Sequence, residues 1–207
     1  MDILRFLNRR VLGEMEQRLR SADAAERIRG IPLVDYDLYT PYLRETFAAA
    51  FDMIERKDPR RFRRVCRYLK GIVALPINSE AGYVPQLQVC AVRFQPLRSK
   101  DKLAKSAAWY AGFLVHEATH GLIHVRGIPY EEHKERIERL CFKEQNRFFK
   151  RLGLTPESLR KLEQINSFKP AAYQPKSFWQ HWREIRRRAK TEKAQQRGAV
   201  GGGERRA

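Results

Sequence analysis

Apolar residues recur at every fourth position near the start of the chain. The residues with this spacing are Ile3, Leu7, Val11, Met15 and Leu19. Because residues four apart share one face of a helix, they predict an amphipathic helix over residues 2–20. A core-facing helix is the favoured interpretation, and a basic helix on a membrane surface is the alternative. A short second helix is expected after Ser21, followed by a Pro-containing connector over residues 31–37.

Two Pro residues mark helix starts in the next part of the chain. Thr40-Pro41 predicts a cap and a first helical position for a helix that runs to about Arg56. Asp58-Pro59 repeats this signal and predicts a helix to Lys70, closed by Gly71. Both helices carry apolar positions that would face a core.

Two stretches have the composition of β-strands. Residues 72–75 form a short apolar run that ends at Pro76. Residues 84–94 are rich in Val, Gln and Phe, and Pro85 near their start is typical of an edge strand. Only these two strands are evident, so the sequence predicts a small sheet.

Two long helices are expected after the strands. Residues 107–115 are apolar nearly all round, which is typical of a buried helix. Gly127 marks its end, and Pro129 blocks its continuation. A second helix is expected from Tyr130 to about Gly153, followed by shorter helical segments. The pattern as a whole predicts a predominantly helical α+β fold.

The chain divides by composition into three parts. We expect an N-terminal helical segment over residues 1–38 and a main domain over residues 39–185. Residues 186–207 contain almost no large apolar side chains and become Gly-rich. Such a segment cannot bury enough surface to fold, so it is predicted to be a basic disordered tail.

A metal-binding pattern lies in the C-terminal half of the buried helix. His116 and His120 are one turn apart, so both imidazoles can reach one ion. Glu117 lies to the side of that pair, where it would face a water molecule on the ion. Polar groups in a buried helix are costly unless something satisfies them. The pattern predicts a zinc site with its general base, although a buried His can also bond a backbone carbonyl.

This segment resembles the active-site helix of the zincin superfamily of zinc metallopeptidases. The matching residues are His116, Glu117 and His120. The metzincin extension is absent, because Ile123 and Arg126 stand where that branch has Gly and His. The gluzincin branch, which takes its third ligand from a Glu on the next helix, is more similar. The resemblance covers roughly residues 106–142 and implies a zincin-like fold, with a small sheet beside the motif helix and one Zn²⁺.

Helix geometry selects a third ligand. A helix rises about 1.5 Å per residue. If the motif helix ends near Arg126 and an antiparallel helix starts near Tyr130, Glu138 is level with the two histidines. Glu138 is also the acid that is bordered by apolar residues. It is therefore the predicted ligand; Glu135 is the alternative, and a surface pairing of Glu138 with Lys134 is the competing interpretation.

The resemblance implies that water attacks the scissile amide of a peptide or protein substrate directly. The metal would activate that water, and Glu117 would carry its proton to the leaving amine. Tyr130, His124 and Tyr83 are candidate donors to the oxyanion, and nothing in the sequence selects among them. By the same resemblance, the strand over residues 84–94 could bind an extended substrate through its backbone.

The net charge of +18 is not spread evenly. Residues 56–70 carry eight basic side chains and one acid, and residues 182–207 carry nine and three. These two patches could contact polyanions nonspecifically. No nucleic-acid-binding motif accompanies them.

Cysteine use and hydropathy bear on the compartment. The three cysteines are far apart and form no disulfide framework, which favours a reducing cytoplasm. Arg5, Arg9 and Arg10 interrupt the apolar positions near the N-terminus, so no signal peptide is predicted. No apolar run approaches 18 residues, so no transmembrane segment is predicted. A cytoplasmic zinc-dependent hydrolase, most simply a metallopeptidase, is the favoured function. A non-catalytic zincin-like scaffold and a basic nucleic-acid-associated protein are the alternatives.

Overall fold

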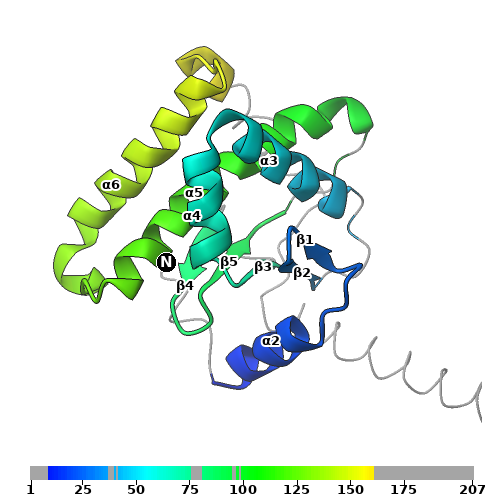
Figure 1. The fold of residues 1–207 in the computed structure, drawn as a ribbon, viewed down its shortest axis with the longest axis vertical. Coiled ribbons are helices and arrows are strands. Elements are labelled where there is room, and N and C mark those ends of the chain that lie inside the picture. The colour runs from blue at the N-terminus through cyan, green and yellow to red at the C-terminus, as the bar shows by residue number, and fades with distance from the viewer. Residues whose placement is uncertain are drawn as a thin grey trace, which may run out of the picture. The chain divides into compact units, whose positions relative to one another are not determined.

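The computed structural model describes residues 9–36, 40, 42–75, 81–94, 97 and 99–160 of the 207-residue chain. All of them fall within one compact unit (Figure 1). The elements are, in chain order, α2 (Arg9–Ser21), β1 (Arg27–Ile28), β2 (Ile31–Asp35), α3 (Leu43–Lys57), α4 (Pro59–Tyr68), β3 (Gly71–Ala74), β4 (Ala81–Val84), β5 (Val89–Val92), a 3₁₀ turn η1 (Lys100–Lys102), α5 (Leu103–Val125) and α6 (Tyr130–Arg151). The fold class is α+β with helices in the majority, as predicted. The predicted tail at 186–207 lies outside the described residues.

The five strands form one mixed sheet. Their order is β1-β2-β3-β5-β4. β2, β3 and β5 are parallel to one another, with Ile72 opposite Cys90 in the central pair. β1 and β4 pair antiparallel to their neighbours at the two edges. β2 belongs to the predicted N-terminal segment, so that segment contributes to the same sheet as the rest.

The structure corrects two predictions for residues 22–36. No helix forms over residues 22–30; β1 and β2 make a hairpin through Arg29 and Gly30, which have φ of 52° and 81°. The predicted connector is β2, a strand with four buried residues. Pro32 is tolerated because it lies opposite the two-residue strand β1, and pairing with β3 begins only at Leu33.

The single strand predicted over residues 84–94 is also corrected. That stretch contains a turn over residues 85–88, where Gln88 has a φ of 55°, and β5 follows it. The edge strand is β4, which ends before Pro85, whereas β5 is fully buried inside the sheet. Five strands therefore replace the two that the sequence suggests, although the sheet is still small.

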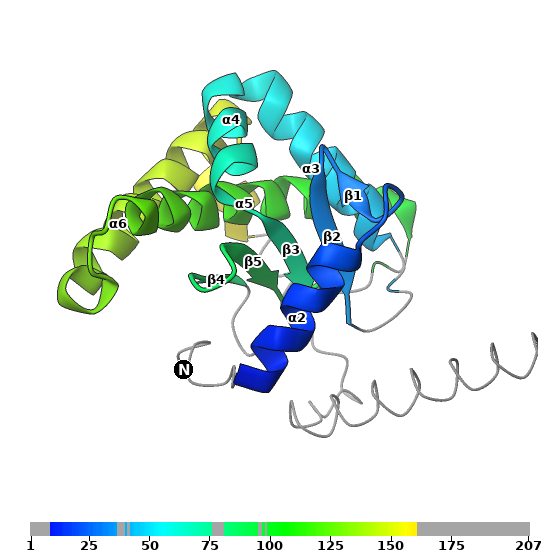
Figure 2. The same ribbon diagram turned by 60° about the horizontal axis from the view of Figure 1, so that its bottom comes forward.

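Helices lie on both faces of the sheet (Figures 1 and 2). α2 covers one face, and a Cβ atom on Gly71 would lie only 2.4 Å from the Leu19 side chain. Val11, Met15 and Leu19 are buried. This confirms the core-facing interpretation for the described part of the helix, whereas Ile3 and Leu7 of the predicted face lie outside the described residues. α3, α4 and α5 pack together over the opposite face and share one hydrophobic core with it.

The predicted start of α4 is confirmed, and the start of α3 is shifted. The Asp58 carboxylate caps α4 by accepting the backbone N–H of Arg61 at 3.1 Å. α3 begins at Leu43, and the Thr40 hydroxyl donates to Asp35 at 3.0 Å rather than capping the helix. Thr40 was predicted to cap the helix, but its hydroxyl binds Asp35 at the end of β2 instead.

α5 and α6 run antiparallel and in contact. Most side chains of α5 from Ser106 to Thr119 are buried, so this helix crosses the core. α6 comes very close to it at Gly112, where a Cβ atom would lie 2.1 Å from the Phe149 ring. Gly127, with a φ of 69°, makes the reversal between the two helices. The hairpin places the N-terminal half of α6 beside the histidines of α5.

Candidate metal centre

The two motif histidines point toward one another from a single face of α5. Their Nε2 atoms are 3.1 Å apart, and His116 is 6% exposed. The run of uncharged residues before them buries this part of α5, so the imidazoles lie at the edge of the core. Two facing ring nitrogens can share one proton or bind one cation.

Glu138 of α6 meets both imidazoles. One carboxylate oxygen lies 3.5 Å from Nε2 of His116 and the other 3.5 Å from Nε2 of His120. Hydrogen bonds from the two histidines lower the pKa of Glu138 well below its ordinary range. Glu135, the alternative ligand, is exposed and makes no ion pair with the histidines in the described part of the chain. We call His116, His120 and Glu138 the donor triad.

The donor triad matches the spacing that a tetrahedral metal requires. Zinc binds imidazole nitrogen and carboxylate oxygen at about 2.0–2.2 Å, so two such donors lie about 3.3–3.5 Å apart. The three separations in the structure are 3.1, 3.5 and 3.5 Å. Two neutral imidazoles and one carboxylate also form a donor set that zinc accepts. The residues present therefore fit one divalent ion.

Glu117 is buried beside the donor triad without a full set of partners. It is 4% exposed, and its Oε2 atom has no hydrogen-bond partner in the described structure. Burial raises the pKa of Glu117, while the nearby histidines and the backbone amide of Tyr83 lower it, and the net shift is upward. A buried, unpartnered carboxylate oxygen is costly unless it serves a ligand. Oε2 of Glu117 is therefore available to accept a proton from a ligand bound beside the histidines.

Gln145 orients His116 from behind. Its Oε1 atom lies 3.0 Å from Nδ1 of His116, and both side chains are buried. Because an amide oxygen only accepts, Nδ1 carries a proton, and in the neutral form of His116 the lone pair is therefore on Nε2, where it is available to a cation. Gln145 was not predicted from the sequence. It lies seven residues after Glu138 and therefore on the same face of α6, which is the signal that could have found it.

The auxiliary candidates have different positions. The Tyr130 hydroxyl donates to Oε1 of Glu138 at 2.7 Å, so it supports a ligand directly. His124 packs against Tyr83 with ring centroids 5.9 Å apart, on the side of α5 that faces β4. The Tyr83 hydroxyl is buried without a partner, and burial raises its pKa to about 12. Neither His124 nor Tyr83 contacts the donor triad through any interaction the structure shows.

Cys141 is a further potential ligand that the sequence analysis missed. Its Sγ atom and one ring nitrogen each of His116 and His120 lie within 4.8 Å of one another. The side chain is fully buried, and burial raises the pKa of its thiol far above the ordinary value. The number of cysteines in the chain was used only to predict the cellular compartment. The informative feature was that Cys141 follows Glu138 by three residues, which places both on one face of a helix.

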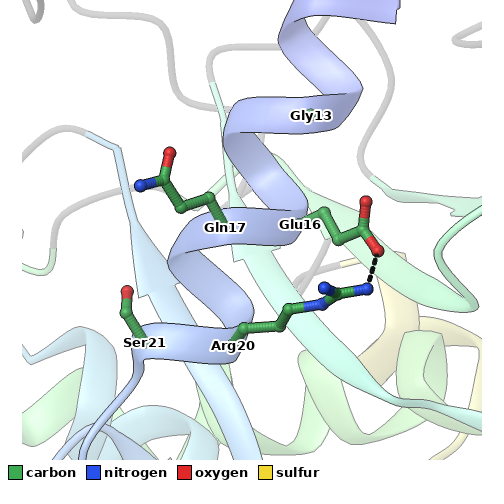
Figure 3. A pocket seen from close by; sticks show the side chains of 5 residues that line it. All are labelled: Gly13, Glu16, Gln17, Arg20 and Ser21. Carbon is green, nitrogen blue, oxygen red and sulfur yellow. Dashed lines mark hydrogen bonds and ion pairs between the residues drawn. The ribbon is translucent and has the colours of Figure 1, made fainter.

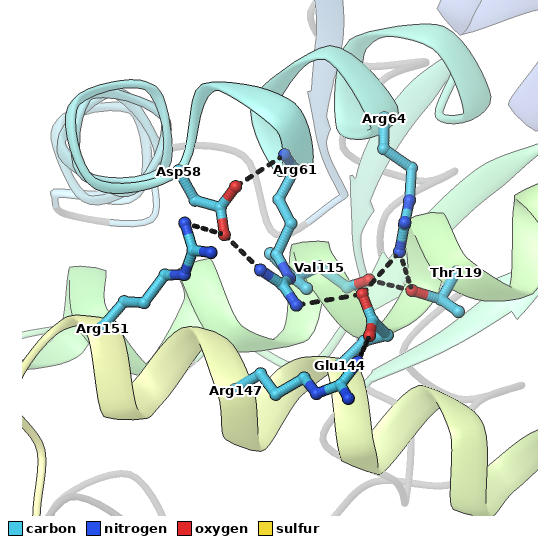
Figure 4. A network of polar contacts seen from close by, with 8 residues as sticks. All are labelled: Asp58, Arg61, Arg64, Val115, Thr119, Glu144, Arg147 and Arg151. Carbon is cyan, nitrogen blue, oxygen red and sulfur yellow. Dashed lines mark hydrogen bonds and ion pairs between the residues drawn. The ribbon is translucent and has the colours of Figure 1, made fainter.

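A cluster of arginines and carboxylates joins α4, α5 and α6 next to this site (Figure 4). Glu144 lies at its centre and accepts from Arg61 at 3.0 Å, Arg64 at 2.9 Å and Arg147 at 2.9 Å. Asp58 pairs with Arg61 and, at 3.2 Å, with Arg151. We call these six residues the arginine–carboxylate cluster. The cluster holds α6 beside α4. Its central residue, Glu144, immediately precedes Gln145 in the chain.

The described residues also line a hollow of about 440 Å³ on α2 (Figure 3). Its lining residues are Gly13, Glu16, Gln17, Arg20 and Ser21. The exposed pair of Arg20 with Glu16 is of a kind that contributes at most about 1 kcal/mol. α2 covers the face of the sheet opposite α5, so the hollow is separate from the donor triad. No residue of the donor triad lines it.

Comparisons with protein-family models, curated protein sequences and solved structures found no match for this chain. The resemblance to zincins therefore rests on the residues of α5 and α6 alone. In the described part of the chain, every helix is too short or too polar to cross a lipid bilayer.

Proposed function

We propose that this chain is a zinc-dependent hydrolase of the zincin type, most simply a metallopeptidase. One observation carries the proposal. Two Nε2 atoms and a carboxylate converge at the spacing of a single ion, and the buried, partnerless oxygen of Glu117 lies on the adjacent residue. A structural histidine pair would not need a second buried acid beside it.

Different residues of the chain would bind the ion, orient its ligands and transfer the proton. A bound divalent ion supplies a nucleophilic water at neutral pH and polarises a carbonyl. His116, His120 and Glu138 would hold that ion, and Gln145 and Tyr130 would keep two of these ligands oriented through their hydrogen bonds. Glu117 takes the proton of the attacking water and delivers it to the leaving amine.

The position of β4 supports an extended peptide as the substrate. β4 is an edge strand of the sheet, so one side of its backbone has no strand partner among the described strands. It lies against α5, where a Cβ atom on Gly121 would be 3.3 Å from the Tyr83 ring. An edge strand can bind an extended chain by backbone pairing, which would align the scissile bond with the donor triad.

Zinc binding and peptide cleavage, measured together, test the proposal. Glu117→Gln should retain the metal and lose about 10²–10⁴-fold in turnover, because only the proton acceptor is removed. His120→Ala should lose the metal itself. Glu135→Gln is the matched control, since it removes an exposed acid from the neighbouring helix. Tight zinc binding with no cleavage of any peptide in a library would favour the non-catalytic scaffold instead.

A nucleic-acid-associated function is a second candidate, favoured by the outer face of α4. Arg60, Arg63 and Arg67 are exposed there, Lys70 is exposed just after the helix, and residues 59–70 contain no acid. The two nearest buried carboxylates, Asp58 and Glu144, face the inner arginines (Figure 4). The outer row is therefore uncompensated within the described structure and suits a phosphate backbone.

A salt-dependent gel shift separates this candidate from attraction by the basic tail. Binding that survives removal of residues 186–207 and weakens on replacement of Arg63 and Arg67 by Gln would support it. The same charge change at Arg136 and Arg139, which are exposed on α6, is the control. Loss of the shift with the tail would mean nonspecific attraction only.

A further inference from the structure

Cys141 lies close to both histidines of the donor triad. It follows Glu138 by three residues on α6, so both side chains face α5. The Sγ atom and the ring nitrogens of His116 and His120 lie within 4.8 Å of one another. Around one tetrahedral ion, a thiolate and an imidazole nitrogen are about 3.5–3.6 Å apart. A closure of no more than about 1.3 Å would therefore bring Sγ into the shell that those distances define.

Packing alone explains only part of this position. Cys141 belongs to a small apolar cluster with Ile123 and Ile137, and a buried thiol can serve there as a small apolar side chain. An alanine or valine would satisfy the same packing. Those residues would not offer a sulfur atom to two ring nitrogens that already face a carboxylate.

We propose that Cys141 is the fourth ligand of the resting metal centre and that it closes the site until a substrate or another event displaces it. This proposal rests on the donor triad holding a metal, as proposed above. On binding, the S–H bond of Cys141 breaks, its proton passes to solvent and a sulfur–metal bond forms, with no change in oxidation state. Two histidines, Glu138 and Cys141 then complete a tetrahedral shell, which leaves no position for the water that Glu117 serves.

A thiolate ligand also sets which ions the site accepts. Soft sulfur donors favour zinc and related ions, whereas all-oxygen ligation suits Mg²⁺, Ca²⁺ and Mn²⁺. The centre would therefore select thiophilic ions through Cys141 and keep them unreactive. This is a regulatory property of the site, and it holds whichever peptide is the substrate.

Cobalt(II) substitution tests the proposal without an activity assay. The full chain is stripped of metal and titrated with Co²⁺, which has visible absorption in a tetrahedral site and an additional near-ultraviolet charge-transfer band when a thiolate is bound. The parent protein and Cys66→Ser should show both absorptions. Cys141→Ser should keep the visible absorption and lose the charge-transfer band. Cys66 is a suitable control because it is a partly buried free cysteine on α4.

The alternative results are distinguishable. A visible spectrum that depends on His120 but has no charge-transfer band in the parent protein would overturn the role of Cys141 and leave the donor triad intact. Absence of any Co²⁺ spectrum would overturn the metal centre itself. Because the decisive measurement is made on the parent protein, a folding defect in Cys141→Ser could not hide a negative result.

Discussion

The contact between Gln145 and His116 gives a quantitative test of the metal centre. Gln145→Leu keeps the approximate size of the side chain and removes the acceptor that lies 3.0 Å from Nδ1 of His116. Both residues are buried, so the Nδ1–H group would be left without a partner, at a cost of about 1–3 kcal/mol in stability. Loss of an outer-shell partner typically lowers metal affinity by about 10–100-fold.

Competition with a chromophoric zinc chelator measures that affinity, and thermal unfolding of the metal-free protein measures the stability. Gln145→Glu restores an acceptor for Nδ1–H and should bind zinc close to the parent affinity. Asn146→Leu changes the next amide on α6, which is exposed, and should leave both quantities unchanged. If Gln145→Leu bound zinc as tightly as the parent protein, the inferred orientation of His116 would be wrong.

Three further predictions concern the framework of the site. Glu144→Gln should lower the free energy of unfolding in a denaturant titration by about 1–3 kcal/mol, because the half-buried Arg64 loses its carboxylate and the buried Arg61 keeps only Asp58; Arg147→Ala, on the exposed side, should cost at most about 1 kcal/mol. Burial raises the pKa of Asp58 and of Glu144, but hydrogen bonds and charge from arginines outweigh it, so both pKa values lie below the ordinary range. The contribution of these two carboxylates to the free energy of unfolding should be present above the ordinary carboxyl pKa of about 4 and be lost as the pH falls through the lowered values. The acid unfolding of Glu144→Gln should therefore depend less on pH than that of the parent protein. Gly112→Ala should lower the melting temperature, because overpacking against the Phe149 ring costs about 1–3 kcal/mol and exceeds the gain of about 1 kcal/mol in helix propensity; an unchanged melting temperature would mean that α6 can move away freely.

Local periodicity was sufficient to predict the core of the candidate site. The rise of a helix and the position of the turn placed Glu138 level with the histidines, and the structure has Glu138 at 3.5 Å from each. Gln145 and Cys141 were not predicted because only an acid was expected as the ligand from α6, although both lie on the face of α6 that carries Glu138. Residue type, rather than geometry, limited that prediction.

Pairing between distant strands was not predictable in the same way. β1 has two residues, and β2 contains Pro32, so neither carries a local strand pattern. β2 exists because Leu33 and Val34 find partners in β3, almost forty residues later. Likewise, residues 84–94 have the composition of one strand, but a turn over residues 85–88, with a positive φ at Gln88, separates β4 from β5. Such features depend on tertiary contacts, which a single sequence does not display.

The position of α6 along α5 determines whether the donor triad exists. One turn of slippage would move Glu138 by about 5.4 Å, which is more than its distance from either imidazole. Three contacts prevent this: the Phe149 ring against Gly112, the bond of Gln145 to His116, and the arginine–carboxylate cluster through Glu144.

Part of the positive charge in α4 therefore has a structural role. Arg61 and Arg64 face inward and hold the acid of α6, whereas the arginines on the outer face of α4 contribute nothing to that alignment. Because the three restraints act on one helix, weakening any of them should loosen the same site. Glu144→Gln should consequently reduce zinc affinity as well as stability, although Glu144 does not belong to the donor triad. Arg63→Gln, on the exposed face of α4, should change neither quantity. An equal loss of zinc affinity from the two substitutions would show that the contact of Glu144 with the inner arginines does not set the alignment of α6.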